Sequence, residues 1–368
     1  MTGLATASVS RLAPPMGLIA ELTHRCPLAC AYCSNPLELA RASAELDTTA
    51  WLRVFEEAAK LGVLHLHLTG GEPMARRDLP QLVKGAAALQ LYTNLITSGV
   101  LLDDAAMAAL VEAGIDHIQL SFQDIADREA DSSAGLAGAH ARKLAAARRI
   151  REAGLPLTLN FVVHRGNVDR TAAMLALGEE LGAARIEIAH VQYYGWGLLN
   201  RSALLPTTAQ LDAATAAVDA ARQRFSGRIV VDYVVPDYYA ARPKACMGGW
   251  AQRFINLSPA GKAMPCHAAE TLPGFDFPSV REHSLAEIWS DSDIFRRFRG
   301  TDWAPEPCRS CDRLEIDWGG CRCQAFALTG DAARTDPACA LSPDHALMQE
   351  ATRQAATAAL RPRRYAGA

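Results

Sequence analysis

The sequence lacks the features that mark membrane, secreted and nucleic-acid-binding proteins. No apolar run reaches the roughly eighteen uninterrupted residues of a membrane-spanning helix. Residues 1–15 hold one Arg and no apolar stretch of signal-peptide length, so no secretory signal is expected. Neither charge dominates, since 37 Lys and Arg oppose 40 Asp and Glu, and no basic stripe is visible. These absences predict a soluble, cytoplasmic protein that binds neither a membrane nor a nucleic acid.

Cysteine is abundant, with ten residues in a chain of 368. In a reducing compartment such a number is typical of metal sites rather than of disulfides. Three cysteines precede residue 34 and seven lie between residues 246 and 339. Half of the residues are apolar, so the chain can bury a large core, and its length fits a barrel-sized domain plus a smaller one, or two ordinary domains.

The region 16–235 alternates short aliphatic runs with Ala-rich stretches that are apolar at helical spacing. The runs are almost continuously apolar, as in a parallel sheet that is buried on both faces. We expect strands at 16–22, 63–68, 91–97, 115–121, 157–163, 185–191 and 228–235, and helices at 48–61, 78–89, 103–113, 138–153, 168–182 and 207–225.

Polar residues recur where these strands end, which is where barrel enzymes have their sites. They favour a closed or partial α/β barrel over a doubly wound sheet. They are Thr69 to Glu72, Thr97-Ser98, Ser121 to Asp124, Asn160 and His190.

The composition changes after Pro236, where helical patterns become rare and Trp, Pro and Gly increase. The region 236–345 has too little aliphatic content for an ordinary core, so metal centres are expected to replace part of it. We expect residues 1–15 to form a flexible tail and residues 346–368 to form a helix followed by a basic tail.

Cys26, Cys30 and Cys33 follow the first strand with the spacing C-x3-C-x2-C. Three thiolates within eight residues can bind three irons of a cubane cluster, and no fourth cysteine lies nearby to bind the last iron. An open coordination position is a place where a substrate or cofactor binds. The alternative is a structural zinc with His24 as fourth ligand, although zinc sites ordinarily use paired spacings.

This triplet, with Tyr32 just before its last cysteine, resembles the hallmark of the radical S-adenosylmethionine (radical SAM) enzymes. Gly70-Gly71-Glu72-Pro73 resembles the element of that family that receives the methionine amino group, although alone it would be a plain turn. Glycines allow close backbone approach, and Glu72 offers a carboxylate to an amine. The resemblance implies a partial (β/α)6 TIM-like barrel. It also implies a 4Fe–4S cluster on the three cysteines that cleaves S-adenosylmethionine to a 5′-deoxyadenosyl radical.

The resemblance also implies cofactor contacts from later strand ends. Ser98, Ser121 and Gln123 are candidates for the carboxylate and the ribose, and Asn160 for the ribose hydroxyls. The alternative is that these residues cap helices or form turns.

The later cysteines resemble the SPASM domain, a C-terminal region that binds two auxiliary iron–sulfur clusters. Asp317 stands where that pattern has a cysteine, and Cys323 is additional. Two four-ligand clusters need eight ligands. The region has seven cysteines, and Asp317 would be the eighth ligand. The implied sets are Cys246, Cys266, Cys321 and Cys323 for one cluster, and Cys308, Cys311, Asp317 and Cys339 for the other.

Three alternatives remain for this region. Asp317 can be a surface turn residue that leaves one cluster with an open site, or the first of the two clusters can be a two-iron type. The spacings C-x2-C and C-x-C can also hold zinc.

Asp317, together with 121–124, 192–196, 200–201 and 318–325, resembles the enzymes that cyclise the precursor peptide of pyrroloquinoline quinone (PQQ). The resemblance spans about 16–345 and implies a carbon–carbon bond between the γ-carbon of a Glu and the ring of a Tyr in a ribosomal peptide. The auxiliary clusters would take away the electron that this oxidation releases.

Four residues after the sixth strand are candidates for the peptide pocket: Tyr193, Tyr194, Trp196 and Arg201, the last pairing with the Glu carboxylate. Equally, Tyr193 and Trp196 can fill the seam between domains.

Partners are implied by the resemblance as well. The first cysteine already stands at position 26, which leaves no room before it for a peptide-recognition domain. A separate small chaperone is therefore expected to present the precursor peptide by strand addition, and a flavodoxin-like protein to supply electrons. The competing functions are another peptide-modifying SPASM enzyme, such as a sulfatase-maturing one, and a non-catalytic iron–sulfur electron carrier or peptide scaffold.

Overall fold

Parallel strands in sequence order form the centre of the molecule. The computed structural model describes residues 12–354 and 359–364. Its sheet has the order β7-β6-β5-β4-β3-β2-β1-β8-β9, and every pair from β1 to β7 is parallel. The predicted strands are β1 (Gly17–Thr23), β2 (His65–Gly70), β3 (Tyr92–Thr97), β4 (His117–Phe122), β5 (Leu157–Val163), β6 (Arg185–His190) and β7 (Val230–Val234).

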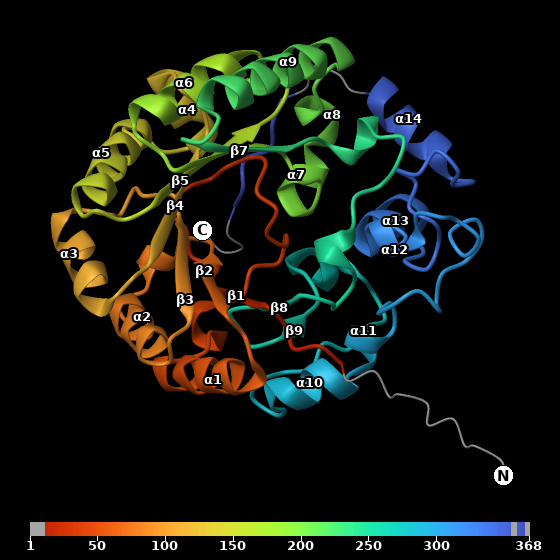
Figure 1. Cartoon of the computed structure of the whole chain (residues 1–368), viewed down its shortest axis with the longest axis horizontal. Helices are drawn as coiled ribbons and strands as arrows, with labels where there is room; N and C mark the ends of the chain where they lie inside the picture. The colour runs from red at the N-terminus through yellow and green to blue at the C-terminus, as the bar shows by residue number, and fades with distance from the viewer. Residues whose placement is uncertain (1–11, 355–358, 365–368) are drawn as a thin grey trace.

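Helices cover the outer face of this arc of strands, as Figure 1 shows. Asp47 caps the first helix by accepting a hydrogen bond from the Ala50 N–H, and Gly62 ends it in the left-handed region at φ +99°. The partial α/β barrel predicted from the sequence is confirmed. The helices are α1 (Thr48–Leu61), α2 (Leu79–Ala88), α3 (Asp104–Ala113), α4 (Asp127–Ala134), α5 (Ala139–Glu152), α6 (Thr171–Glu180), α7 (Gly195–Leu199), α8 (Arg201–Leu204) and α9 (Thr208–Phe225).

The chain after β7 adds two strands to the same sheet and occupies the open side of the arc (Figure 1). β8 (Phe254–Leu257) lies parallel to β1, with Gly17 opposite Phe254, and β9 (Ala263–Met264) returns antiparallel. The sheet therefore crosses the boundary expected near residue 235. Short helices follow: α10 (Leu285–Asp291), α11 (Asp293–Arg296), α12 (Leu314–Asp317), α13 (Arg322–Thr329) and α14 (His345–Arg353).

One apolar core joins the barrel to the cysteine-rich region. Trp51 and Phe55 of α1 and Phe295 of α11 are fully buried members of the same cluster, which also includes the side chain of Cys323. Burial of such aromatic side chains supplies a large share of the stabilising apolar area. Within the described residues, no helix combines the length and the apolar character needed to cross a membrane.

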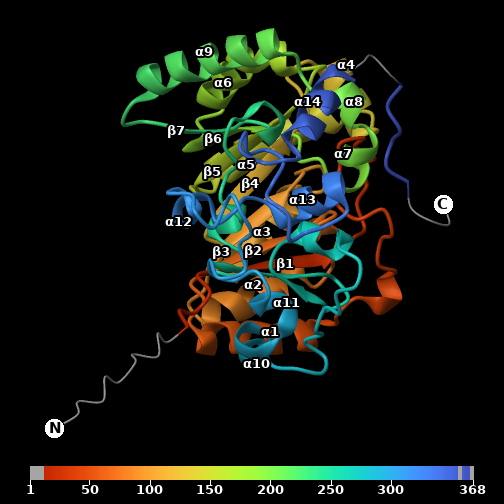
Figure 2. The same ribbon diagram turned by 90° about the vertical axis from the view of Figure 1, so that its right-hand side faces the viewer.

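The two terminal segments expected at 1–15 and 346–368 lie partly outside the described residues, which omit 1–11, 355–358 and 365–368. The predicted C-terminal helix is present as α14. Residues 359–364 form no helix and lie on the same side of the molecule as α7 and α8, as Figure 2 shows.

Candidate active site

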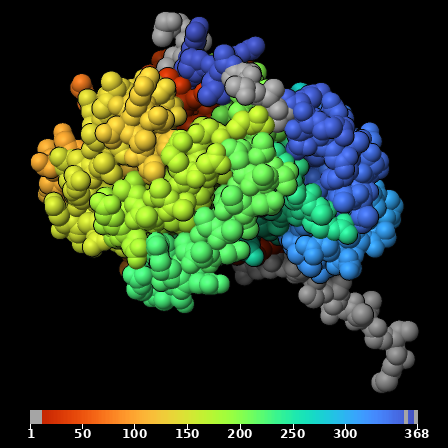
Figure 3. All heavy atoms as spheres, turned by 90° about the horizontal axis from the view of Figure 1, so that it is seen from above, coloured from red at the N-terminus to blue at the C-terminus, as the bar shows by residue number. Residues whose placement is uncertain are grey.

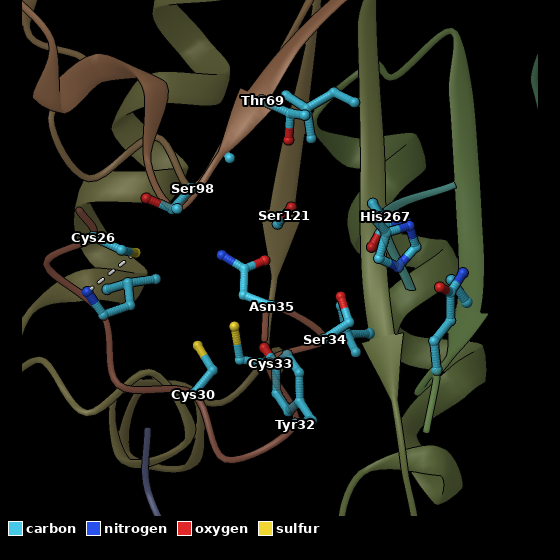
Figure 4. Close-up of a pocket in the computed structure, with 18 of the residues that line it drawn as sticks. Cys26, Cys30, Tyr32, Cys33, Ser34, Asn35, Thr69, Ser98, Ser121 and His267 are labelled. Carbon is cyan, nitrogen blue, oxygen red and sulfur yellow. Dashed lines mark hydrogen bonds between the residues drawn. The ribbon is translucent and has the colours of Figure 1, made fainter. Parts of the chain in front are cut away.

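A cavity of about 420 Å³ opens at the carboxyl ends of the barrel strands. Figure 4 shows Cys30 and Cys33 with their sulfurs pointing into it, and Ser98 and His267 on other parts of its wall. The structure thus gathers the three-cysteine loop and the strand ends around one space. The predicted residues that line it are Cys26, Cys30, Tyr32, Cys33, Gly70, Gly71, Ser98, Ser121, Gln123 and Asn160.

The glycines at the end of β2 let the cysteine loop approach the sheet. The N–H of Gly71 donates to the carbonyl of Thr23 over 2.6 Å. A Cβ on Gly71 would lie 2.5 Å from the carbonyl oxygens of both His24 and Arg25, and one on Gly70 would lie 2.3 Å from that of Thr23. We predicted these glycines for close approach to a ligand, and the structure adds that they allow close approach of the loop itself.

Glu72 is fully buried, next to the cavity wall rather than among the lining residues. Its carboxylate accepts hydrogen bonds from Thr97 Oγ1 at 2.6 Å and from the Ser98 N–H at 2.8 Å, and a further one from the Ser98 hydroxyl. The Met74 N–H donates to it as well, over 3.1 Å. Glu72 therefore ties the end of β2 to the end of β3, and Ser98 is held in place by this carboxylate.

Lys143 of α5 is a site residue that the sequence analysis missed. Only 1% of it is exposed, and its ammonium donates to the carbonyl of Ser121 at 2.7 Å and to Gln123 Oε1. Burial lowers its pKa to about 8, while the nearby Cys30 and Glu72 favour the charged form. In an Ala-rich helix with several Arg residues, nothing in the local sequence distinguishes a buried lysine from a surface one.

Asn160 is oriented by a second carboxylate that the sequence analysis did not single out. Its amide donates to Glu187 Oε2 of β6 at 2.7 Å, and the Gln119 amide donates to the same oxygen at 3.1 Å. Both amides line the cavity. Glu187 therefore fixes which face of each amide is presented to a ligand.

The contacts of His24 do not support the alternative in which it is the fourth ligand of a zinc ion on the three-cysteine loop. Its Nδ1 accepts the N–H of Ala40 over 2.8 Å, and its Nε2 lies 3.5 Å from Glu21 Oε2. Within the described residues, no three His, Cys, Asp or Glu side chains are grouped as the ligands of a single metal ion are.

Burial is the main influence on the pKa values of the three thiols in the loop. It raises the pKa of Cys26 to about 12, and it raises those of Cys30 and Cys33 as well. Arg363 opposes this effect at all three. It lines the cavity although it belongs to the expected basic tail.

A second cavity, of about 190 Å³, lies beside the first. Three of the first predicted auxiliary set, Cys246, Cys266 and Cys321, line it, and Cys323 Sγ lies 3.8 Å from Cys266 Sγ. The two cavities share part of their walls, which makes the auxiliary site a neighbour of the barrel site. The shared residues are His190, Val191, Gln192 and His267.

The second predicted auxiliary set also comes together in space. Cys308, Cys311, Asp317 and Cys339 line one small cavity. Asp317 is 8% exposed, and burial raises the pKa of its carboxyl, while the Gly319 N–H donates to it at 3.1 Å. The structure therefore places this aspartate with three cysteines rather than on an exposed turn.

None of the four residues named for the peptide pocket lines the 420 Å³ cavity, and they lie in three different environments. Tyr193 packs edge-on against Tyr238 with ring centroids 5.0 Å apart, and Arg201 donates to the Tyr238 hydroxyl at 3.1 Å. Trp196 is absent from the linings of both cavities. Tyr194 instead reaches the auxiliary site, where its hydroxyl lies 3.0 Å from Cys321 Sγ.

Sequence comparison identifies the family. Residues 20–177 match the model of the Radical SAM superfamily, and residues 246–312 match that of the SPASM iron-sulfur cluster-binding domain. The PqqA peptide cyclase of Granulibacter bethesdensis is 67% identical over 343 residues, which cover 93% of this chain and 92% of that protein. The chain belongs to the PqqA peptide cyclase family. The PqqA peptide cyclase of Gluconobacter oxydans is 63% identical over 92% of this chain and 94% of its own length.

Solved structures of the superfamily share the fold. Streptococcus suis SuiB bound to S-adenosylmethionine has a TM-score of 0.72 at 19% identity, covering 87% of this chain and 76% of that one. The structure of anSMEcpe with AdoMet and a peptide has a TM-score of 0.65 at 16% identity, covering 93% and 97%. Membership of the family confirms the predicted cofactors: S-adenosylmethionine, a 4Fe–4S cluster and auxiliary iron–sulfur clusters of the SPASM domain.

Proposed function

We propose that this enzyme cyclises a ribosomal precursor peptide, joining the γ-carbon of a Glu to the ring of a Tyr, as the first committed step toward PQQ. The observation that carries the proposal is the 67% identity, over nearly the whole chain, to a protein named PqqA peptide cyclase. The placement of Asp317 among three cysteines supports it, because this aspartate is the departure from the SPASM pattern on which the resemblance rested.

The residues around the 420 Å³ cavity fit the radical SAM cofactors. Cys26, Cys30 and Cys33 are the three cysteines in the lining of the cavity, and they would hold three irons of a 4Fe–4S cluster and leave its fourth position for S-adenosylmethionine. With both cofactors bound, the site would supply radical chemistry for hydrogen-atom abstraction from the peptide. Gly70, Gly71 and Glu72 would receive the amino group, and Lys143 is a buried cation suited to balance a carboxylate. The remaining contacts would come from Tyr32, Ser98, Ser121, Gln123 and Asn160.

The reaction removes two hydrogens from the peptide. One leaves as the hydrogen atom taken from the Glu γ-carbon, and the other leaves the Tyr ring as a proton and an electron. That electron could leave through the wall that the two cavities share, because the thiols of Cys246, Cys266 and Cys321 lie directly on its other side. Tyr194 contacts Cys321, and its ring packs edge-on against His267 with centroids 6.0 Å apart.

Two partners belong to the proposal: a small chaperone that presents the peptide, and a flavodoxin-like protein that supplies electrons. A peptide substrate is supported by the names of the relatives, and SuiB has also been solved bound to its precursor peptide. Tyr193 and Arg201 are engaged with Tyr238, and Tyr194 contacts Cys321, so of the four Tyr194 is the candidate for a role at the auxiliary site.

The test is an anaerobic reaction of iron-reconstituted enzyme with S-adenosylmethionine, reductant, precursor peptide and chaperone. Mass spectrometry of peptide and nucleoside together should show 5′-deoxyadenosine and a peptide lighter by two hydrogens with an internal crosslink. Cys30→Ala should abolish both products while the auxiliary clusters remain. Formation of 5′-deoxyadenosine with an unchanged peptide would favour the function of another peptide-modifying SPASM enzyme over the proposed one. No nucleoside from any reduced preparation would favour a non-catalytic carrier or scaffold.

A further inference from the structure

The C-terminal strap, defined here as residues 359–364, lies against the loop that carries the three cysteines. The N–H of Arg363 donates to the carbonyl of Ala29 over 3.2 Å, and its Nη2 donates to the carbonyl of His24 at 2.6 Å. Figure 3 shows blue C-terminal residues lying next to red residues of the N-terminal part. Two ends of the chain more than 300 residues apart in sequence are thus joined at the cluster site.

A buried amide clamps the strap to the same loop. Asn200, 3% exposed, accepts the N–H of Arg361 at 2.8 Å and donates to its carbonyl at 2.9 Å. The same Nδ2 donates to the carbonyl of Ala31 at 2.8 Å. One side chain therefore joins the strap to the segment between Cys30 and Cys33, and backbone groups of both are satisfied by it.

Arg363 is the one arginine of the described strap that is buried: it is 6% exposed, whereas Arg361 and Arg364 are exposed. It lines the cavity together with all three cysteines of the loop. A guanidinium is costly to bury unless anionic groups or hydrogen bonds compensate it. Thiolates that hold a cluster are such anionic groups.

We propose that the strap is a working part of the cluster site, in which Arg363 is a positioning residue that raises the reduction potential of the cluster on Cys26, Cys30 and Cys33. Reduction adds one electron, and hence one negative charge, to a cluster that three thiolates already make anionic. A buried cation beside it stabilises the reduced form more than the oxidised form. Asn200 holds that cation in place through Arg361. The inference rests on the cluster assignment made under the proposed function.

The test compares two substitutions that remove the same charge from the same strap. In Arg363→Gln the potential of the N-terminal cluster, measured by an EPR-monitored redox titration without S-adenosylmethionine, should fall. In Arg364→Gln, which removes an exposed charge, it should equal that of the unmodified enzyme. Arg363→Lys should restore most of the loss. Equal potentials in Arg363→Gln and Arg364→Gln would overturn the role of the buried charge.

Iron is counted in every variant. If the Gln variant does not retain its cluster, Asn200→Ala, which removes the side chain that holds the strap through Arg361, carries the comparison, and its potential should also fall. A second measurement needs no cluster: hydrogen exchange of the Arg361 and Arg363 amides in the iron-free chain. Both should be protected, and Asn200→Ala should speed exchange at Arg361 about thirtyfold, as expected for the loss of both hydrogen bonds to Arg361 at about 1 kcal/mol each. Exchange at free-peptide rates in the unmodified chain would show that the strap does not dock, and the proposal would fall.

The two proposals can fail separately. If the potential shifts as expected but the peptide is not cyclised, the strap inference stands and the substrate assignment falls. If the peptide is cyclised and Arg363→Gln behaves like Arg364→Gln, the function stands and the strap inference falls.

Discussion

Replacing Lys143 by Met tests whether the ammonium beneath the site is as strongly buried as the structure shows. Burial lowers the pKa of this lysine from 10.5 to about 8. The unfolded chain therefore binds the proton more tightly than the folded chain between these two values. By linkage, Lys143 makes the folded state more stable as pH rises from about 8 toward 10.5, and it costs stability below that window.

The magnitude follows from the two pKa values. Since each pKa unit is worth about 1.4 kcal/mol, the difference between 10.5 and about 8 amounts to about 3 kcal/mol. Met has nearly the same length and no charge, so Lys143→Met removes this contribution with little change in packed volume. The variant should be more stable than the unmodified chain at neutral pH, and the advantage should shrink as pH rises.

Urea unfolding of the reduced, iron-free chain at several pH values between about 7 and 10 measures the effect. Groups remote from Lys143 titrate alike in both chains and cancel in the difference, which therefore reports Lys143 together with the nearby Cys30 thiol, whose pKa Lys143 lowers. Lys84→Met is the matched control, because Lys84 is an exposed lysine on α2. Its difference from the unmodified chain should not depend on pH. A pH-independent difference for Lys143→Met as well would refute the assigned burial of the charge.

Three further substitutions test the site, and a fourth, Gly154→Ala, is the control for Gly71→Ala. Gly71→Ala would place a Cβ 2.5 Å from two backbone carbonyl oxygens, so it should lower the free energy of unfolding by about 1–3 kcal/mol in urea titrations. Gly154→Ala, where no atom lies within 4 Å of the added Cβ, should cost only the strain of its left-handed backbone, about 1–2 kcal/mol, and leave iron binding by Cys26, Cys30 and Cys33 intact. Asp317→Ala should alter the EPR signal or the iron content of one auxiliary cluster and leave the other unchanged, and identical spectra would remove Asp317 from the ligand set. Tyr194→Phe removes a hydroxyl 3.0 Å from Cys321 Sγ, so the potential of that auxiliary cluster should fall, because hydrogen bonds to cluster sulfur raise it.

Local patterns predicted the barrel well because strand and helix periods are local properties of the sequence. The strand expected at 157–163 is Leu157–Val163, and the helix expected at 48–61 is Thr48–Leu61. α4 was missed, since its sequence DREADSSA is mostly polar and buries only Ala130 and Ala134. The three-cysteine loop was found for a similar reason, because its ligands lie within eight residues.

The contacts that complete the site are long-range, and no local pattern reports them. β8 pairs with β1 through residues such as Phe254 and Gly17, which a hydrophobic run alone cannot match to each other. Lys143 and Arg363 are cations, and cations are mostly exposed, so the pattern assigns them to the surface. Their burial is compensated by oxygen acceptors from distant segments: the Ser121 carbonyl and the Gln123 amide for Lys143, and the His24 carbonyl for Arg363.

The order of the strands brings the two cysteine-rich sites side by side. Because β8 adds to the sheet beside β1, the cysteine-rich region begins next to the strand that leads into the Cys26 loop. β9 then turns the chain back, and three residues later His267 lines both cavities. An electron released at the peptide would therefore cross one layer of side chains to reach Cys266 or Cys321, instead of the width of a separate domain. Because both regions belong to one sheet, the distance between the two sites is fixed by the fold. A flexible linker between two domains would leave that distance variable.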